Sequence, residues 1–179
     1  MAKIAEWLNR VESAVLRRSV APSTGAPARW IIAVTTAAQG SVLWLVIAAG
    51  LAMRAGVSRR AAVRGMTAAT AASAASHLLG KALTHRPRPR AEHLPARRVL
   101  PEQPKSSSFP SAHAASAAAF TTALALESPL LGAVITPVAV VVAYSRVRTW
   151  AHWPTDVIAG AVLGGITAAV TRRLPVPRR

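Results

Sequence analysis

The feature that most constrains this chain is a largely apolar run without a single charge, from Trp30 to Met53. A helix of about 20 such residues crosses the hydrocarbon core of a bilayer. The whole chain carries a formal net charge of +16, yet 52% of its residues are hydrophobic. A basic nucleic-acid-binding protein is polar overall, and a disordered basic segment lacks long apolar runs. The sequence therefore indicates an integral membrane protein and argues against nucleic-acid binding.

Further uncharged segments follow along the chain, and each is bounded by charges or prolines. They cover residues 65–80, 112–126, 130–144 and 157–170. The arginines between residues 53 and 65 predict a short basic loop, and the prolines between residues 84 and 108 predict a long one. The many alanines, together with Gly132, Gly160, Gly164 and Gly165, predict helices that pack closely.

The N-terminal stretch from Lys3 to Arg18 is amphipathic and suits a helix that lies on a membrane surface. We therefore expect an all-α integral membrane bundle with about five spanning helices and an N-terminal interfacial helix. Residues 1–29 would form the N-terminal segment and linker, residues 30–171 the membrane domain and residues 172–179 a basic tail.

Three polar clusters interrupt this pattern, and the first runs from Lys81 to Pro89. Pro87 and Pro89 prevent one continuous helix, so we expect the helix to stop near His85 and Arg88 to fold back. Two fixed cations at a membrane surface suit an anion. A basic flank that anchors a helix to headgroups has the same composition.

The second cluster is Pro110-Ser111-Ala112-His113, directly before an alanine-rich segment. Ser111 is placed to cap that helix, whose free backbone N–H groups would then face any anion beside Ser111 and His113. A structural cap beside an interfacial histidine is the plainer interpretation of this cluster alone.

The third cluster runs from Ser145 to Asp156 and includes Arg146 and His152. Pro154 suits the first turn of the last helix. Because His152 and Asp156 are four residues apart, the carboxylate can hold one ring nitrogen and direct the other outward. A helix-capping aspartate beside an interfacial histidine is the alternative.

Five spans would bring all three clusters to the same side of the membrane. The side chains that meet there include three cations, one hydroxyl, two histidines and one carboxylate: Lys81, Arg88, Arg146, Ser111, His113, His152 and Asp156. This combination predicts a phosphate-binding pocket with its own chemistry. The chain has no cysteine, which excludes a thiolate nucleophile. The long loop offers only two carboxylates, Glu92 and Glu102, which are a poor ligand set for magnesium.

The order Lys-x6-Arg-Pro, Pro-Ser-x-His and Ser-Arg-x5-His-x3-Asp resembles the type 2 phosphatidic acid phosphatase (PAP2) family. These lipid phosphatases share a fold with vanadium haloperoxidases. The resemblance covers about half of the chain, from Leu78 to Gly164. Ala112 stands where the family usually has glycine; alanine keeps the backbone N–H but narrows the pocket.

The resemblance implies a role for each motif residue. Lys81, Arg88 and Arg146 would neutralise the phosphate, with Ser111 and the N–H of Ala112 as further donors. His152 would attack phosphorus and form a phosphohistidine, and Asp156 would orient His152. His113 would protonate the leaving group and later activate water. No metal or other cofactor is implied, and the partners would be the bilayer and a lipid phosphate.

Two other functions use the same residues. A vanadium-dependent haloperoxidase would share the pocket, although those enzymes are usually larger and soluble. A non-catalytic protein that holds anionic lipids would need the basic patches, but not an aspartate four residues after a histidine. The sequence leaves open the lipid, which is a polyprenyl-linked phosphate or phosphosugar or a phosphatidate-type lipid, and also the oligomeric state.

Membrane orientation follows from the distribution of Lys and Arg. Even without the three pocket cations, the side that holds the clusters and the N-terminus carries more of them than the opposite side. By the positive-inside rule we expect a multi-pass protein of the inner (plasma) membrane with a cytoplasm-facing active site. The family resemblance favours the opposite orientation, because many bacterial members face the periplasm or the exterior.

Overall fold

The computed structural model describes residues 2–20, 28–38, 41–89 and 106–175. Within these ranges the chain forms seven α-helices and no strand, which confirms the expected all-α class. The helices are α1 (Ala2–Val20), α2 (Ala28–Ala37), α3 (Val42–Ala52), α4 (Val57–Leu83), α5 (Ala112–Glu127), α6 (Pro129–Arg148) and α7 (Pro154–Thr171). The predicted linker at residues 22–27 lies outside the described residues, and the domain division stays a prediction.

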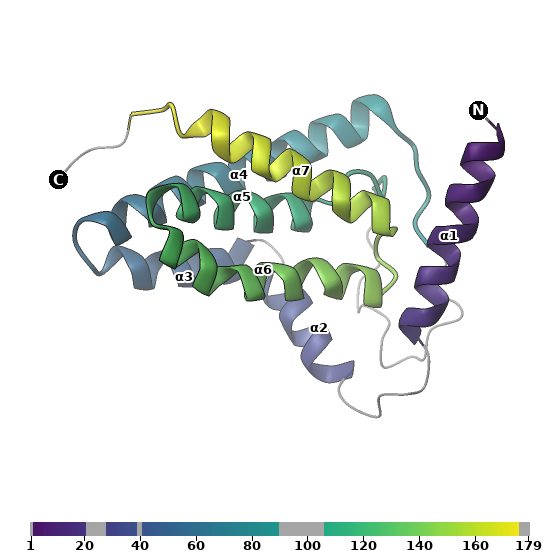
Figure 1. The fold of residues 1–179 in the computed structure, drawn as a ribbon, viewed down its shortest axis with the longest axis horizontal. Coiled ribbons are helices and arrows are strands. Elements are labelled where there is room, and N and C mark those ends of the chain that lie inside the picture. Colours follow the sequence, from purple (N-terminus) through teal and green to yellow (C-terminus); the bar gives the residue numbers. More distant parts are fainter. Residues whose placement is uncertain (1, 21–27, 39–40, 90–105, 176–179) are drawn as a thin grey trace.

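Helices α3 to α7 run side by side along the long axis of the molecule, and α1 lies across one end of this bundle (Figure 1). The central helix is α5, which packs against α4, α6 and α7. Its many alanines let these neighbours approach closely, and most of its residues from Ala114 to Leu124 are buried. This arrangement places the first turn of α5 between the ends of α4, α6 and α7 that carry the polar clusters.

The prediction of one continuous span from Trp30 to Met53 is wrong. Helix α2 ends at Ala37 and α3 begins at Val42, and the two helices point in different directions in Figure 1. Ser41, the residue before α3, has a φ of 66°. A residue in this left-handed conformation cannot continue a right-handed helix, so the apolar run is divided into two short helices.

The basic loop after Met53 is shorter than predicted. Its arginines at positions 59, 60 and 64 lie in the first turns of α4, because arginine and alanine both favour helix. Arg64 and Arg60 contact Glu127 of α5 at 2.7 and 3.5 Å, which ties α4 to α5 at the end of the bundle away from α1. The connection that remains is a short turn that ends at Gly56, whose φ is 74°.

The helix boundaries around the polar clusters are confirmed. Helix α4 stops at Leu83, where Thr84 is extended, close to the stop expected near His85. Ser111 caps α5 and accepts a hydrogen bond from the N–H of Ala114 at 3.4 Å. Pro154 is the first residue of α7.

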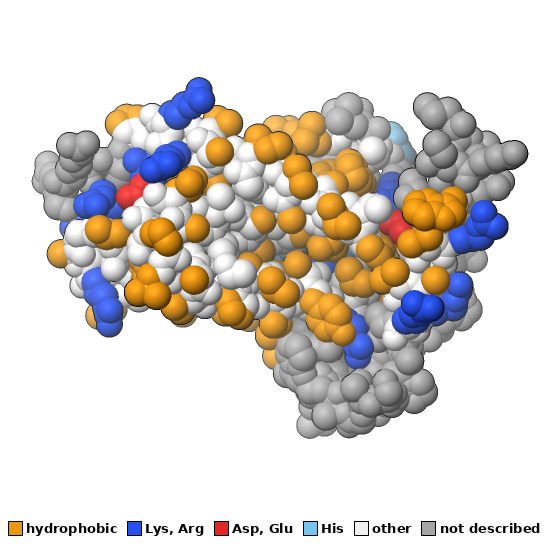
Figure 2. Space-filling view, viewed as in Figure 1, with side chains coloured by type: hydrophobic (Ala, Val, Ile, Leu, Met, Phe, Trp, Pro, Cys, Tyr) orange, Lys and Arg blue, Asp and Glu red, His pale blue; other side chains and the backbone are white. Residues whose placement is uncertain are grey.

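Two described helices, α6 and α7, are long and apolar enough to cross a membrane, and α3 is apolar but shorter. The count of about five spans therefore stays a prediction. Large apolar side chains on α6 and α7 are more than half exposed, including Leu130, Val134, Ile158 and Val162. Figure 2 shows Lys and Arg side chains gathered toward the two ends of this face, with no charged side chain in its middle. This distribution is typical of a bundle that faces lipid.

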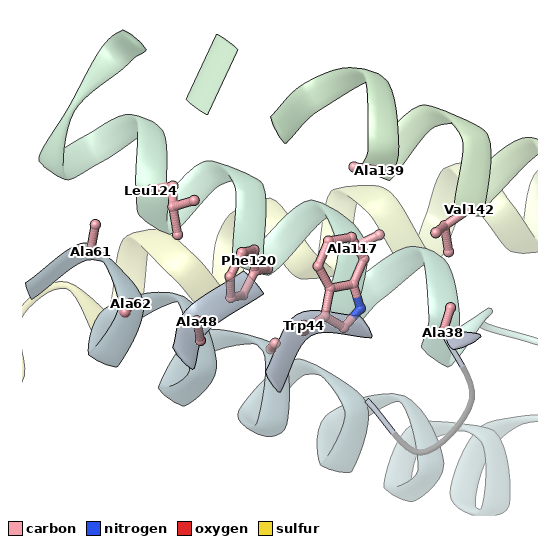
Figure 3. Close-up of a cluster of buried hydrophobic side chains, with 11 residues drawn as sticks. Ala38, Trp44, Ala48, Ala61, Ala62, Ala117, Phe120, Leu124, Ala139 and Val142 are labelled. Carbon is pink, nitrogen blue, oxygen red and sulfur yellow. The ribbon is translucent and has the colours of Figure 1, made fainter. Parts of the chain in front are cut away.

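The largest buried apolar cluster joins α3, α4, α5 and α6 (Figure 3). Trp44 of α3 and Phe120 of α5 are fully buried, with ring centroids 5.1 Å apart. Alanines fill the spaces between these two rings and the neighbouring helices.

Close packing of α7 on α5 depends on two of the predicted glycines, Gly160 and Gly164, whereas the prediction is wrong for Gly165. A Cβ at Gly160 would meet the carbonyl oxygen of Ser111, and one at Gly164 would meet the backbone of Ala115 and Ala119. A Cβ at Gly165, by contrast, would have nothing within 4 Å. Gly160 and Gly164 thus let α7 approach the start of α5.

We expect Gly164→Ala to destabilise the protein by about 1–3 kcal/mol, because the added methyl group forces α5 and α7 apart. Thermal unfolding in detergent measures this change. Gly165→Ala, on the open side of the same helix, is the matched control and should unfold at or slightly above the wild-type temperature. Equal effects of the two variants would contradict the packing described above.

Candidate active site

A cavity of about 570 Å³ lies where the three polar clusters meet. This volume is typical of small-molecule sites. Five of the predicted site residues line it: Arg88, Ala112, His113, Arg146 and His152. Ser111 and Asp156 are completely buried in the adjoining wall. Lys81 belongs to the last turn of α4, and its side chain lies outside the described part of the structure.

Arg88 reaches the cavity from the extended segment after α4. Its guanidinium donates to the carbonyl oxygens of Ala151 at 2.6 Å, Ser106 at 3.1 Å and Ser107 at 3.2 Å, and to Nε2 of His152 at 3.2 Å. Burial lowers the pKa of Arg88 from its ordinary value, an effect that Asp156 opposes. The group stays a cation at neutral pH and joins the first cluster to the third.

The second cluster enters the cavity through the first turn of α5. Ala112 and His113 line the cavity, and Nε2 of His113 is buried without a hydrogen-bond partner. The backbone N–H of Ser111 donates to the carbonyl oxygen of Asp156 at 3.0 Å, which joins the start of α5 to the start of α7. A helix N-terminus at a cavity wall favours an anion.

The third cluster reaches the cavity through a tight turn after α6. Trp150 has a φ of 52°, and the N–H groups of Ala151 and His152 both donate to the carbonyl oxygen of Arg146, at 3.1 and 3.2 Å. The turn therefore folds His152 back beside Arg146, whose buried side chain also lines the cavity.

The partners of His152 define its tautomer. Nδ1 lies 2.7 Å from the carbonyl oxygen of Ser108, which can only accept, so Nδ1 carries the proton. Nε2 faces the guanidinium of Arg88, which can only donate, so Nε2 presents a lone pair to the cavity. Burial lowers the pKa of His152, and Arg146 and Arg88 lower it further, while Asp156 and the Ser108 carbonyl oppose the shift. The imidazole is therefore neutral at physiological pH.

Asp156 lies next to His152 but is not its nearest partner. Oδ2 is 3.8 Å from Nδ1, beyond hydrogen-bond distance, and it accepts from the N–H of Trp153 at 2.9 Å. Oδ1 accepts from Arg86 at 2.5 Å. The Ser108 carbonyl thus aligns the imidazole directly, and the buried carboxylate adds a negative charge behind it.

Sequence reasoning missed Ser108, Arg86 and Glu12. Ser108 contacts His152 through its backbone carbonyl, so the identity of its side chain could not indicate this role. Arg86 lies in the same basic run as Arg88, and Glu12 lies in α1, far away in the sequence. His77 and His85, to which the motifs assign no role, also line the cavity.

Comparison with known proteins identifies the family. A profile of the PAP2 superfamily matches residues 61–179, which include all three clusters. The chain therefore belongs to the PAP2 superfamily.

Individual relatives agree with this assignment. An undecaprenyl-diphosphatase of Sulfolobus acidocaldarius is 43% identical over 70 residues, which are 37% of this chain and 32% of that protein. The match thus spans about a third of the length of that relative.

Two solved structures have the same fold. A PAP2-type phosphatidylglycerolphosphate phosphatase from Bacillus subtilis has a TM-score of 0.68 and 20% identity, covering 92% of this chain and 84% of the other. Aquifex aeolicus LpxE has a TM-score of 0.70 and 21% identity, with coverages of 90% and 94%. The fold is therefore that of membrane PAP2 phosphatases.

The tautomer of His152 can be tested without a substrate. We expect ¹⁵N NMR of histidine-labelled protein in detergent to show Nδ1 protonated and Nε2 unprotonated at neutral pH. The titration midpoint should lie below the ordinary value of 6.5, because burial and two cations disfavour the imidazolium. As pH falls through that lowered value, Nε2 gains a proton. A midpoint at or above 6.5, or a proton on Nε2 at neutral pH, would contradict the assigned environment; His152→Asn identifies the resonance.

Proposed function

We propose that this protein is a lipid phosphatase that hydrolyses a phosphomonoester or diphosphate of a membrane lipid through a phosphohistidine on His152. The observation that carries the proposal is the lone pair of Nε2, which faces a cavity lined by Arg88 and Arg146. Family membership supports it, as do the names of the undecaprenyl-diphosphatase and phosphatase relatives. The lipid is either a polyprenyl-linked phosphate or phosphosugar, or a phosphatidate-type lipid.

The phosphate group would displace the hydrogen bond between Arg88 and Nε2. Arg88 and Arg146 would bind its oxygens, with Lys81 as the third cation and Ser111 and the N–H of Ala112 as further donors. As the transition state forms, negative charge accumulates on the equatorial oxygens, and fixed donors bind it more strongly there. Neither arginine has to move far, because both already line the cavity.

In the first step, Nε2 of His152 attacks phosphorus as the bond to the leaving oxygen breaks. The bound phosphate offsets the positive charges of Arg88 and Arg146, which would let His113 take up a proton when substrate binds. The leaving oxygen then takes that proton from Nε2 of His113, which has no other partner. The imidazole gains positive charge as the N–P bond forms, and the negative charge of Asp156 stabilises it. The proton stays on Nδ1, which continues to donate to the carbonyl oxygen of Ser108.

In the second step, water attacks the phosphorus of the phosphohistidine. His113, now neutral, accepts a proton from that water, and the N–P bond breaks to return His152 with its lone pair on Nε2. Inorganic phosphate leaves. The fixed cations supply the charge neutralisation for both steps, so we propose that no metal is required.

Phosphate release from a lipid phosphate or diphosphate in detergent micelles tests the proposed function. We expect turnover with a chelator present and no added metal. His152→Ala should lose nearly all turnover at an unchanged unfolding temperature, because the group proposed to accept the phosphoryl is then absent. Activity that disappears with chelator and returns only with a divalent ion would contradict the metal-free chemistry.

The role of His113 has its own test, which depends on the leaving group. His113→Ala should reduce kcat strongly for a lipid substrate, whose alkoxide needs a proton to leave. The same variant should lose less activity on an aryl phosphate, whose phenolate leaves without one. Equal losses in the rate of leaving-group release, measured in a single turnover so that the second step does not contribute, would rule out the general-acid role.

We also propose about five membrane spans, with α1 as an interfacial helix. Support comes from the outward face of α1, where Trp7, Val11 and Val15 are exposed beside exposed Arg10 and Arg17. Such a face suits the headgroup layer of an anionic leaflet. The protein would lie in the plasma membrane with its active site toward the cytoplasm.

A reporter fused after Arg179 tests this orientation. The C-terminal end of α7 is at the end of the bundle away from α1 (Figure 1). The cavity is at the opposite end of α7, because His152, just before that helix, lines it. We expect a reporter that is active outside the cytoplasm to work there, and a reporter that is active only inside to fail. The opposite pattern would place the active site on the outer side.

A further inference from the structure

The amphipathic helix α1 holds a carboxylate that is buried rather than exposed. Glu12 is only 3% exposed, and Leu16, one turn later, packs against Trp150. Burying a carboxylate is unfavourable unless hydrogen bonds and an opposite charge compensate. The face of α1 that carries Glu12 therefore points at specific partners in the bundle.

Those partners lead directly to the candidate active site. Oε2 of Glu12 accepts from Arg86 at 2.6 Å, and Oε1 accepts from the backbone N–H and the hydroxyl of Thr155, at 3.1 and 2.5 Å. The other terminal nitrogen of Arg86 donates to Oδ1 of Asp156 at 2.5 Å and to Thr155 at 2.7 Å. One guanidinium thus joins a carboxylate of α1 to the carboxylate beside His152.

We propose that Glu12 is a positioning residue of the active site, and that it acts through Arg86 on Asp156. The expected effect of Glu12 on kcat rests on the proposed function. The link from Glu12 through Arg86 to Asp156 rests on the contacts given above. Helix α1 would then contribute a residue that orients the catalytic groups. This helix lies outside residues 61–179, which match the family profile.

Charge explains why Arg86 needs a second carboxylate. Arg86 alone would neutralise Asp156 and weaken the stabilisation of positive charge on His152. With Glu12 present, the three groups together keep one negative charge, and the guanidinium is shared between two anions. The imidazolium-like transition state then still experiences a net negative charge behind it.

Geometry gives the second reason. The side chain of Arg86 is 26% exposed, so without Glu12 one terminal nitrogen of its guanidinium would lose its protein partner and the side chain would be held less firmly. Its guanidinium also lies over the ring of Trp153, 5.5 Å from the centroid, and the indole N–H of Trp153 donates to the carbonyl oxygen of Pro87 at 2.9 Å. Glu12 binds the terminal nitrogen of Arg86 that makes none of these contacts.

The test compares Glu12→Gln with Glu127→Gln in the full-length protein. Glutamine at position 12 can still accept from Thr155 but loses the ion pair with Arg86. Glu127 is the matched control, since it also bridges helices through arginines, but at the end of the bundle away from α1. We expect Glu12→Gln to lower kcat about 10- to 100-fold, the range seen when a group that orients a metal-binding side chain through a hydrogen bond is lost. KM should change less than about twofold, since only the transition state needs the oriented charge.

A double-mutant cycle separates positioning from general stability. If Glu12 acts through Asp156, then Glu12→Gln should cost little further activity once Asp156→Asn is present. Arg86→Lys should resemble Glu12→Gln, because an ammonium cannot serve two carboxylates in a fixed fork. Full additivity, or a kcat for Glu12→Gln equal to that of Glu127→Gln, would overturn the proposal.

An NMR measurement tests the positioning role of Glu12 without any substrate. The chain has five histidines, so the His152 resonance can be followed in the ¹⁵N spectrum of each variant. We expect Glu12→Gln to shift the titration of His152 while Glu127→Gln leaves it unchanged. An unshifted His152 would overturn the positioning role. Wild-type protein that hydrolyses no lipid phosphate would instead contradict the proposed function, and the spectra would still decide on Glu12.

Discussion

The arrangement of the site depends on one buried carboxylate, Asp156. Its side chain is inaccessible to solvent, so each oxygen has to be compensated within the protein. One oxygen accepts from Arg86 and the other from the N–H of Trp153, while its backbone carbonyl accepts from Ser111. These bonds draw the segment after α4, the first turn of α5 and the start of α7 to one point. The lone pair of His152 is presented beside that point.

Helix packing makes this convergence possible. Glycines at 160 and 164 let α7 lie directly on the backbone of α5, so the N-termini of both helices reach the same end of the bundle. The left-handed turn at Trp150 then returns the chain from α6 to α7 with His152 facing inward. Small residues within the helices therefore allow the helices to approach closely. This approach brings the polar residues at the helix ends within contact distance of one another.

Much of this could be predicted from the sequence, because the three motifs carry their chemistry in side chains at fixed spacing. The cap at Ser111, the start of α7 at Pro154 and the convergence of Arg88, Arg146 and His152 all follow from such local patterns. Backbone conformation was harder. Nothing in the uncharged run from Trp30 to Met53 indicated a break at Ser41, since hydropathy is insensitive to a single left-handed residue.

Long-range pairing was the other limit. Glu12 looked like one of several solvated charges on an amphipathic helix, and only the fold shows that it faces Arg86 while Val11 and Val15 face outward. Similarly, spacing suggested Asp156 as the partner of His152, whereas the Ser108 carbonyl lies nearer to Nδ1. A backbone acceptor has no sequence signature.

The central claim is that Nε2 of His152 forms a covalent bond to phosphorus. Rapid acid-free quenching of the enzyme with a labelled lipid phosphate, followed by peptide mapping in alkali, tests it most directly. We predict a phosphoramidate that is stable in base, labile in acid and located on His152. In His113→Ala it should accumulate when a labelled aryl phosphate is the substrate, because the phenolate leaves without a proton while water is activated poorly. A phosphorylated residue other than His152, or turnover by His152→Ala at the wild-type rate, would contradict the account.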